Sequence, residues 1–133
     1  MPVDFHAEAD GVEAKILYNL FRSLFKIGNE IEMEMTRDKL YFKTFNEAKT
    51  IFCNTYFDSS FFKQFEASDD IEVCSIQLKT AISMFRGHAS IESFRIDLDC
   101  SNSELIFNFR CRNGVRKTFT VFYCTREPTK VCY

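Results

Sequence analysis

The sequence switches twice between the periodicity of a helix and that of a strand, and this alternation limits the folds open to it. Most of the chain places apolar residues at every second position, as in Ile31, Met33 and Met35, a pattern typical of a half-buried strand. Short turns separate these segments, so neighbouring strands run antiparallel. The sequence therefore predicts an α+β domain, with a mostly antiparallel sheet and two helices packed side by side on one face of it.

The expected elements can be placed by residue number. We expect strands at 3–8, 31–35, 39–45, 49–57, 71–77, 94–100, 105–111 and 116–125, and helices at 11–26 and 78–86. Asp10 is a suitable cap for the first helix and Gly28 a suitable stop. Asn113-Gly114 predicts a tight hairpin of type I′, which needs positive φ at both central residues. The apolar segment 59–66 has no regular period.

Each predicted helix has one polar face and one apolar face. The polar faces carry Lys15, Asn19, Arg22 and Lys26 on the first helix, and Lys79, Ser83 and Arg86 on the second. The opposite faces carry Val12, Ile16, Leu17, Leu20, Phe21 and Leu24, and then Leu78, Ala81, Ile82 and Phe85. Helices packed side by side would merge the two polar stripes into one basic surface.

The overall charge makes this local basic surface informative. The chain has 17 Lys and Arg against 19 Asp and Glu, a net charge of −2, which argues against non-specific anion binding by the whole surface. Cations gathered on two helix faces favour a partner of negative charge. The alternative is that they simply occupy solvated helix faces.

Length and cysteine usage set the class of protein. A chain of 133 residues is expected to form one domain, over residues 1–125, with 126–133 as a tail or the start of a linker. No apolar run approaches the roughly 18 residues that cross a bilayer, and the start of the chain does not resemble a secretory signal. Five of the six cysteines fall inside strand patterns, which favours buried free thiols in a reducing compartment, cytosol or nucleus.

No set of residues predicts catalysis, a metal site or a cofactor. His6 and His88 lie far apart in sequence, and His6 is expected to be structural. Asp97 and Asp99 share one side of a strand, but no third carboxylate or histidine is placed to complete a two-metal site, which argues against a nuclease. There is no phosphate-binding glycine loop.

Several short motifs, in order, resemble one family. They are Ser23-Leu24 before Ile27–Glu30, Phe61-Phe62 before Gln64, Met84–Arg86, and above all Gly114–Thr118 with the sequence Gly-Val-Arg-Lys-Thr. Over residues 3–125 the chain is similar to the N-terminal domain of the Rad-nine subunit of the nine-one-one checkpoint clamp. This family is related to proliferating cell nuclear antigen and the other DNA sliding clamps.

The resemblance implies a non-catalytic subunit of a nuclear heterotrimeric ring. Such a ring encircles double-stranded DNA and acts as a scaffold in DNA-damage checkpoint signalling and repair, with a clamp loader and checkpoint or repair proteins as further partners. The family has a second domain of the same kind and a long tail. In this plan the polar residues of both helices, Lys15 to Arg86 as given above, face DNA.

The plan also implies where subunits meet. The last strand would be an edge strand that pairs with a neighbouring subunit through Arg116, Lys117, Phe119, Val121 and Tyr123, and the strand at 50–56 would be the other edge. Arg116 and Lys117 have three readings: a contact across the boundary, an addition to the basic surface, or charges that discourage edge aggregation. An isolated domain with two open edges is expected to associate head to tail, or to aggregate, at high concentration. The alternative function is a stand-alone interaction module that binds protein through its edge strand and never touches DNA.

Overall fold

The computed structural model describes residues 4–69, 71 and 73–126. Within them the elements follow in the order β1 (Phe5–Asp10), α1 (Gly11–Phe25), β2 (Glu30–Met35), β3 (Lys39–Phe45), β4 (Phe52–Asp58), the 3₁₀ turn η1 (Ser59–Phe61), β5 (Gln64–Ala67), β6 (Val73–Gln77), α2 (Leu78–Phe85), the 3₁₀ turn η2 (His88–Ser90), β7 (Ile91–Asp99), β8 (Glu104–Cys111), β9 (Arg116–Phe122) and β10 (Cys124–Arg126). Residues 127–133, most of the expected tail, lie outside the described part. No helix in that part is long and apolar enough to cross a membrane.

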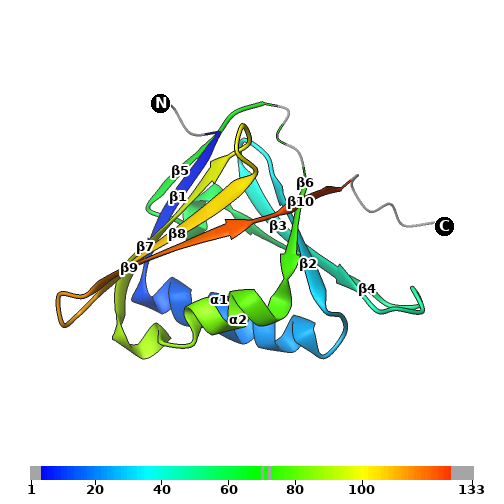
Figure 1. Cartoon of the computed structure of the whole chain (residues 1–133), viewed down its shortest axis with the longest axis horizontal. Helices are drawn as coiled ribbons and strands as arrows, with labels where there is room; N and C mark the ends of the chain where they lie inside the picture. The colour runs from blue at the N-terminus through cyan, green and yellow to red at the C-terminus, as the bar shows by residue number, and fades with distance from the viewer. Residues whose placement is uncertain (1–3, 70, 72, 127–133) are drawn as a thin grey trace.

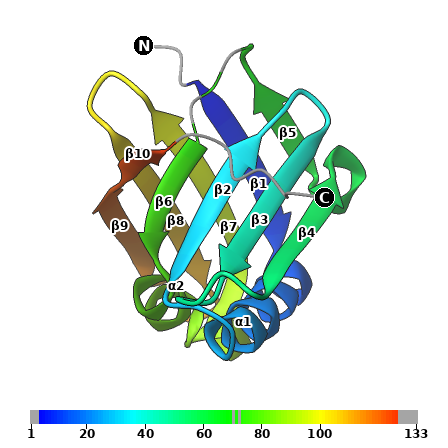
Figure 2. The same cartoon turned by 90° about the vertical axis from the view of Figure 1, so that its right-hand side faces the viewer.

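The strands form two antiparallel sheets. The first sheet has the order β5-β1-β7-β8-β9 and the second β10-β6-β2-β3-β4. Figure 1 shows the sheets leaning together at one end and spreading toward the other, where α1 and α2 lie side by side. In Figure 2 both helices lie below the ends of the strands of the second sheet. The predicted α+β class, with both helices on one side of the molecule, is confirmed.

The division into two sheets differs from the single sheet expected from the sequence, and helix length explains it. Eight strands side by side at about 4.8 Å each would make a sheet about 40 Å wide. Helices of 15 and 8 residues are only about 22 and 12 Å long and about 10 Å across, so they cannot cover such a face. Two sheets instead cover each other, and the helices close the open side.

Two local predictions are corrected at the ends of strands. The strand expected over 116–125 is two strands, because the chain leaves the first sheet after Phe122 and joins the second at Cys124. Between them the backbone N–H of Tyr123 donates to the carbonyl of Ser103. The irregular segment after η1 contains a further strand, β5, which pairs with β1 from Phe5↔Ala67 to Glu8↔Gln64.

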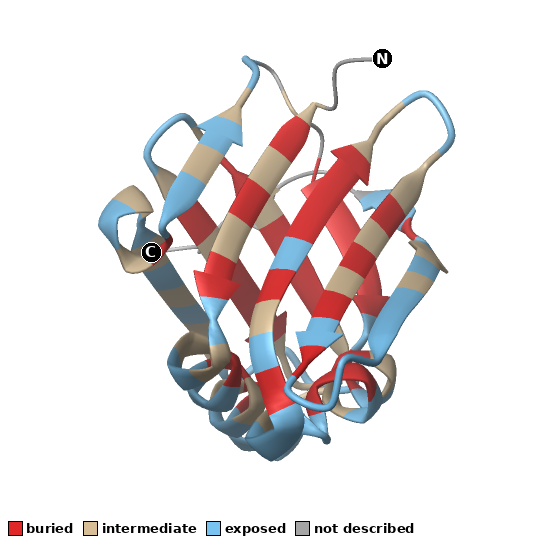
Figure 3. Ribbon diagram, turned by 90° about the vertical axis from the view of Figure 1, so that its left-hand side faces the viewer, coloured by how far each residue is buried: buried red, intermediate tan, exposed pale blue. Residues whose placement is uncertain are grey.

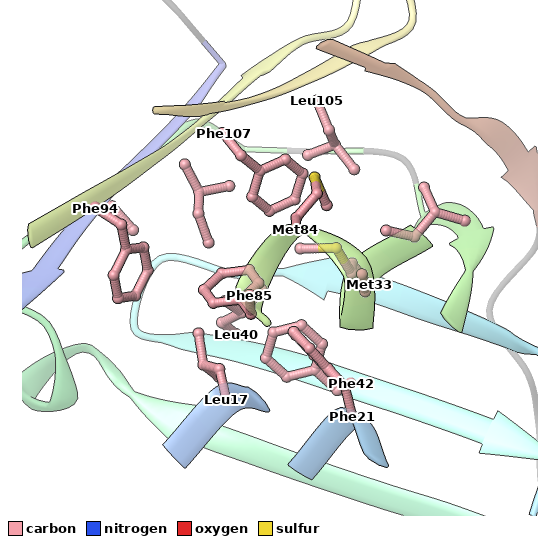
Figure 4. Close-up of a cluster of buried hydrophobic side chains, with 14 of the residues drawn as sticks. Leu17, Phe21, Met33, Leu40, Phe42, Met84, Phe85, Phe94, Leu105 and Phe107 are labelled. Carbon is pink, nitrogen blue, oxygen red and sulfur yellow. The ribbon is translucent and has the colours of Figure 1, made fainter. Parts of the chain in front are cut away.

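The core lies between the two sheets and the helices, and Phe85 of α2 is central to it. Its ring centroid lies 5.5 Å from that of Phe21 on α1, 5.4 Å from that of Phe94 on β7 and 5.0 Å from that of Phe109 on β8. Phe21 in turn packs on Phe42 of β3, in the second sheet, at 5.3 Å. Figure 4 shows the rings of Phe21, Phe42, Phe85 and Phe94 in the space between the sheets and the helices. Along the first sheet buried and more exposed residues alternate, as Figure 3 shows.

Helix α1 begins and ends where the sequence predicts, for reasons that the structure makes specific. Glu13 accepts a hydrogen bond of 3.0 Å from the backbone N–H of Asp10, half of a capping box. A Cβ on Gly11 would lie 2.2 Å from the carbonyl oxygen of Ile91, and one on Gly28 would lie 2.3 Å from that of Phe45. Both ends of the helix therefore need glycine because they pass directly against strands.

The β8–β9 hairpin forms at Asn113-Gly114, but not with the predicted turn. Among the described residues positive φ occurs at Lys49, Ser103 and Gly114, where it is 85°, and not at Asn113. A type I′ turn needs it at both central positions. The four residues between β8 and β9 make a longer loop, in which the amide of Gly114 donates to the carbonyl of Cys111.

Candidate nucleic-acid interface

The predicted polar stripes of both helices lie on the surface. The buried faces are formed by Ala14, Leu17, Phe21 and Leu24 of α1 and by Leu78, Ala81, Met84 and Phe85 of α2. On the opposite side Lys15, Asn19, Arg22, Lys26, Lys79, Ser83 and Arg86 are all exposed. Because α1 and α2 pack against each other, the fold brings these seven residues onto one two-helix surface, called here the helix face.

The helix face is less uniformly polar than the sequence indicated. Val12 and Ile16, predicted to face the core, are 70% and 43% exposed. The buried stripe of α1 runs through Ala14, Leu17 and Phe21 at intervals of three and four residues. Val12 and Ile16 do not belong to this series, so their side chains lie outside the buried stripe. They therefore stand beside Lys15, and an apolar pair borders the basic stripe at the start of the helix.

The helix-face cations are left free by the fold. Among the described residues no carboxylate lies within ion-pair distance of Lys15, Arg22, Lys26, Lys79 or Arg86. Glu13 is the acid of α1, and it is engaged at the helix start. Their charge is therefore available to a partner.

Arg22 is nevertheless positioned. Its guanidinium carbon lies 5.8 Å from the ring centroid of Tyr18, a cation–π contact. The Tyr18 ring stacks on that of His88, with centroids 4.8 Å apart. His88 belongs to η2, and its ring packs across onto α1, where it supports the tyrosine that contacts Arg22.

Helix α2 and the predicted edge strand meet in a surface hollow. Its volume is about 440 Å³, and Lys79 and Ser83 line it together with Gln77, Met84 and Phe119. Sequence reasoning assigned Phe119 to the subunit boundary and Lys79 to the DNA side, and no sequence signal placed them together. Their proximity follows from the way β9 passes α2.

The two predicted edges are edges of the sheets. Among the described strands β9 pairs with β8 alone, and β4 pairs with β3 alone. Arg116 and Lys117 are exposed, whereas Phe119 and Val121 pack against the core and Tyr123 is buried in it. Strand β9 can therefore contact a neighbour through its backbone and its outward side chains. The side chains of Phe119, Val121 and Tyr123 are already packed within this domain.

Sequence reasoning missed a polar network around the buried Asp97 on the solvent side of the first sheet. The Nδ1 atom of His6 lies 2.6 Å from Asp97 Oδ1 and its Nε2 lies 3.2 Å from Glu8 Oε2, while Arg95 Nε donates to Asp97 Oδ2 at 3.0 Å. Burial lowers the pKa of His6, but the hydrogen bonds to Asp97 and Glu8 outweigh it and raise this pKa above its usual 6.5. Of the two aspartates that the sequence analysis considered, Asp97 and Asp99, the network contains Asp97, which has a structural role there.

No metal-binding cluster accompanies the helix face in the described part of the chain. Within those ranges no group of three or more His, Cys, Asp or Glu side chains is placed to hold a metal ion. The cysteines that the structure describes, Cys53, Cys74, Cys100, Cys111 and Cys124, are not joined to one another by disulfide bonds. The feature that distinguishes this molecule is the helix face.

Comparison with known proteins agrees with this geometry. The model of the family described as Rad9 matches residues 17–133. The cell cycle checkpoint control protein Rad9 of Drosophila melanogaster is 23% identical over 113 residues, which is 84% of this chain and 25% of that protein.

Solved structures give the fold. The proliferating cell nuclear antigen of Thermococcus kodakaraensis superposes with a TM-score of 0.81 at 12% identity, over 97% of this chain and 50% of that one. The proliferating cellular nuclear antigen of Entamoeba histolytica superposes with a TM-score of 0.74 at 14% identity, over 93% of this chain and 47% of that one. The chain thus spans about half of each solved chain and a quarter of the fly protein, and the predicted clamp-domain fold is confirmed.

Proposed function

The chain belongs to the Rad9 family, and on this premise we propose that it is a wall segment of a DNA-encircling checkpoint clamp, with its helix face toward the duplex. In this role it is a non-catalytic scaffold for DNA-damage checkpoint signalling and repair in the nucleus. Its partners are the two other subunits of the clamp, double-stranded DNA inside the ring, a clamp loader, and checkpoint or repair proteins.

One observation carries this proposal: five exposed cations on two adjacent helices have no internal ion-pair partner among the described residues. A duplex presents one phosphate charge per about 1.7 Å of its axis, and Lys and Arg attract it without reading its sequence. Asn19 and Ser83 add neutral hydrogen-bonding groups to the same surface. Cations that hold no carboxylate of their own can exchange phosphates, as a sliding contact requires.

The free edges fit assembly with neighbours on both sides. Among the described strands β9 lies at one end of the first sheet and β4 at one end of the second, with β5 and β10 at the other ends. An edge strand can pair with a strand of another chain through its open backbone groups. We propose that β9 meets a neighbouring subunit and that β4 meets a second domain of the same protein. In isolation the two edges favour head-to-tail association of copies of this chain.

The first experiment is assembly. The folded chain is mixed with the two other checkpoint-clamp subunits and analysed by size-exclusion chromatography with light scattering. We expect a stable complex with at least one of them, and a variant carrying proline in β9, Val121→Pro, should abolish it because proline removes a backbone donor and disturbs the strand. Absence of association from a chain shown to be folded would contradict the proposal.

The second experiment separates DNA binding from assembly. In the assembled complex, Lys15→Gln with Arg22→Gln should weaken binding to duplex DNA and lower the slope of log K against log salt by about 2, or roughly 0.9 for each phosphate that the variant no longer neutralises. The matched control is Arg37→Gln with Lys39→Gln, which removes the same charge at the β2–β3 turn. An interaction module that never touches DNA would show no difference between the two pairs.

A further inference from the structure

Two arginines stand opposite each other across β8 and β9. The strand register pairs Arg110 directly with Arg116, and both are exposed. They lie on the solvent side of the first sheet, because Phe109, the neighbour of Arg110 along β8, packs in the core. Like charges directly opposite each other destabilise a sheet, so this pair works against the fold unless something negative lies between its members.

A third arginine lies within the same surface. Arg95 of β7 is paired with Asn108, which is paired with Thr118 of β9. Arg95, Arg110 and Arg116 line one pocket of about 360 Å³, together with Asn108, Thr118 and Lys117. The other ionisable residue lining it is Glu8, which already contacts His6 at 3.2 Å.

The carboxylates nearby neutralise this charge only in part. Arg95 Nε donates to Asp97, and Arg110 Nε lies 3.9 Å from a carboxylate oxygen of Glu92, too far for a hydrogen bond. Within the described residues Arg116 has no ion pair. The pocket therefore keeps a net positive charge.

The neutral groups of the pocket are also arranged to donate. The hydroxyl of Thr118 donates to Asn108 Oδ1 at 2.7 Å. This bond uses the acceptor atom of the Asn108 side chain and leaves its Nδ2 hydrogens for another acceptor. Guanidinium groups likewise only donate, and they match the two oxygens of a carboxylate.

We propose that this pocket binds carboxylate side chains of an acidic peptide segment on a partner protein. Discouraging edge aggregation accounts for a charge on β9, but not for Arg110 and Arg95, because β8 and β7 are interior strands with no open edge to protect. DNA is a less suitable occupant for two reasons. The pocket lies on the solvent side of the first sheet and not on the helix face proposed to meet the duplex. With a volume of about 360 Å³ it has room for one or two side chains rather than for a duplex. Binding at this pocket does not depend on the proposed clamp function.

The probe for this proposal is a hexaglutamate peptide added to the isotopically labelled chain at low salt, followed by NMR. We expect saturable shifts of the backbone amides of residues 93–95, 108–110 and 116–118. Arg110→Gln with Arg116→Gln should weaken peptide binding at least tenfold. The matched control, Arg37→Gln with Lys39→Gln, removes the same charge at the β2–β3 turn and should leave the affinity within twofold of that of the unmodified chain.

Two further probes distinguish other occupants. Inorganic phosphate that shifts these amides while hexaglutamate does not would overturn the peptide proposal and leave a small-anion site. Duplex DNA that displaces the peptide from these residues would overturn it in favour of nucleic acid. Peptide shifts confined to residues of the helix face, or shifts unaffected by the Arg110 and Arg116 changes, would overturn it as well.

A melting experiment tests the electrostatic argument without a ligand. Arg116→Gln should raise the melting temperature at low salt by about 2 °C, because it removes a repulsion between two like charges on paired strands. Hexaglutamate should stabilise the unmodified chain and not this variant. The control Arg112→Gln, an exposed arginine in the adjoining loop, should not change the melting temperature, and an equal rise in both variants would contradict a specific Arg110–Arg116 repulsion.

Discussion

Charged side chains are used differently on the helix face and on the solvent sides of the two sheets. Two cations on the sheets are held by carboxylates: Lys43 Nζ lies 2.9 Å from Glu34 Oε2, and Arg95 Nε lies 3.0 Å from Asp97 Oδ2. The opposed pair Arg110 and Arg116 on the first sheet is the exception described above. On the helix face, as far as the structure describes the chain, the five cations have no such partner.

The buried, paired charges contribute to the stability of the fold, whereas the exposed charges of the helix face can interact with a partner. Asp97 is 4% exposed and Lys43 is 9% exposed, so both need partners to be tolerated inside the protein. Lys15 and Arg86 are solvated and need none. Substitutions of these buried, paired sheet residues should therefore change stability, and substitutions on the helix face should change binding.

The largest effect should come from Asp97→Asn. The carboxylate of Asp97 holds His6 and Arg95 at once, and hydrogen bonds to charged groups each contribute about 1.5–3 kcal/mol. We expect the free energy of unfolding to fall by about 2–3 kcal/mol, measured by urea denaturation. The control is Asp69→Asn, which breaks the exposed pair with Arg37 and should cost less than about 1 kcal/mol; equal losses would mean that burial does not set the value of these pairs.

A smaller effect should come from Lys43→Met in the second sheet. The Nζ of Lys43 pairs with Glu34 and lies 5.3 Å from the ring centroid of Tyr41. Its removal leaves a half-buried carboxylate without this partner, so we expect a loss of about 1–2 kcal/mol. Adding Glu34→Leu should recover much of the loss, because an apolar pair avoids the desolvation of charge, and thermal melting of the single and double variants measures both.

The His6 network should also make stability depend on pH. The pKa of His6 is raised above 6.5 in the folded protein, so folding favours the protonated ring. The resulting stabilisation is fully present below the unfolded pKa of about 6.5, and it is lost as the pH rises through the higher folded pKa. Denaturation midpoints of the chain and of His6→Gln should therefore differ in slope across this window, and parallel slopes would show that His6 does not carry the dependence.

The sequence predicted the elements of this fold better than their assembly. A strand such as Ile31 to Met35 can be recognised from its own residues, because alternating apolar positions show which of its faces is buried. The division into two sheets depends on pairing between strands that are distant in sequence, such as β10 with β6. The periodicity within each strand gives no information about this pairing. Strand β5 was missed because it has only four residues, too few to show a period within the irregular segment 59–66.

The candidate site was predictable where one helix determines it. The spacing from Lys15 to Lys26 fixes a common face on any helix of this length, so those residues lie together as expected. The sequence could not reveal that Tyr18 and His88 support Arg22, or that Arg110 and Arg116 are opposed, since both depend on packing and register. Val12 and Ile16 were misplaced because the width of the buried stripe depends on how the helix sits on the strands.

The smallest effect on stability should come from the helix face itself. Lys79→Gln with Arg86→Gln removes two exposed cations that touch no carboxylate among the described residues, and surface changes of this kind alter the free energy of unfolding by less than about 0.5 kcal/mol. Urea denaturation of the double variant measures it, and the same protein assembled with its partner subunits reports DNA affinity. A stability loss above about 1 kcal/mol would mean that these cations hold the fold together, and the distinction between the helix face and the sheets would then fail. An unchanged stability with weaker, less salt-dependent DNA binding would assign their charge to the duplex, because no other measured property of the chain would have changed.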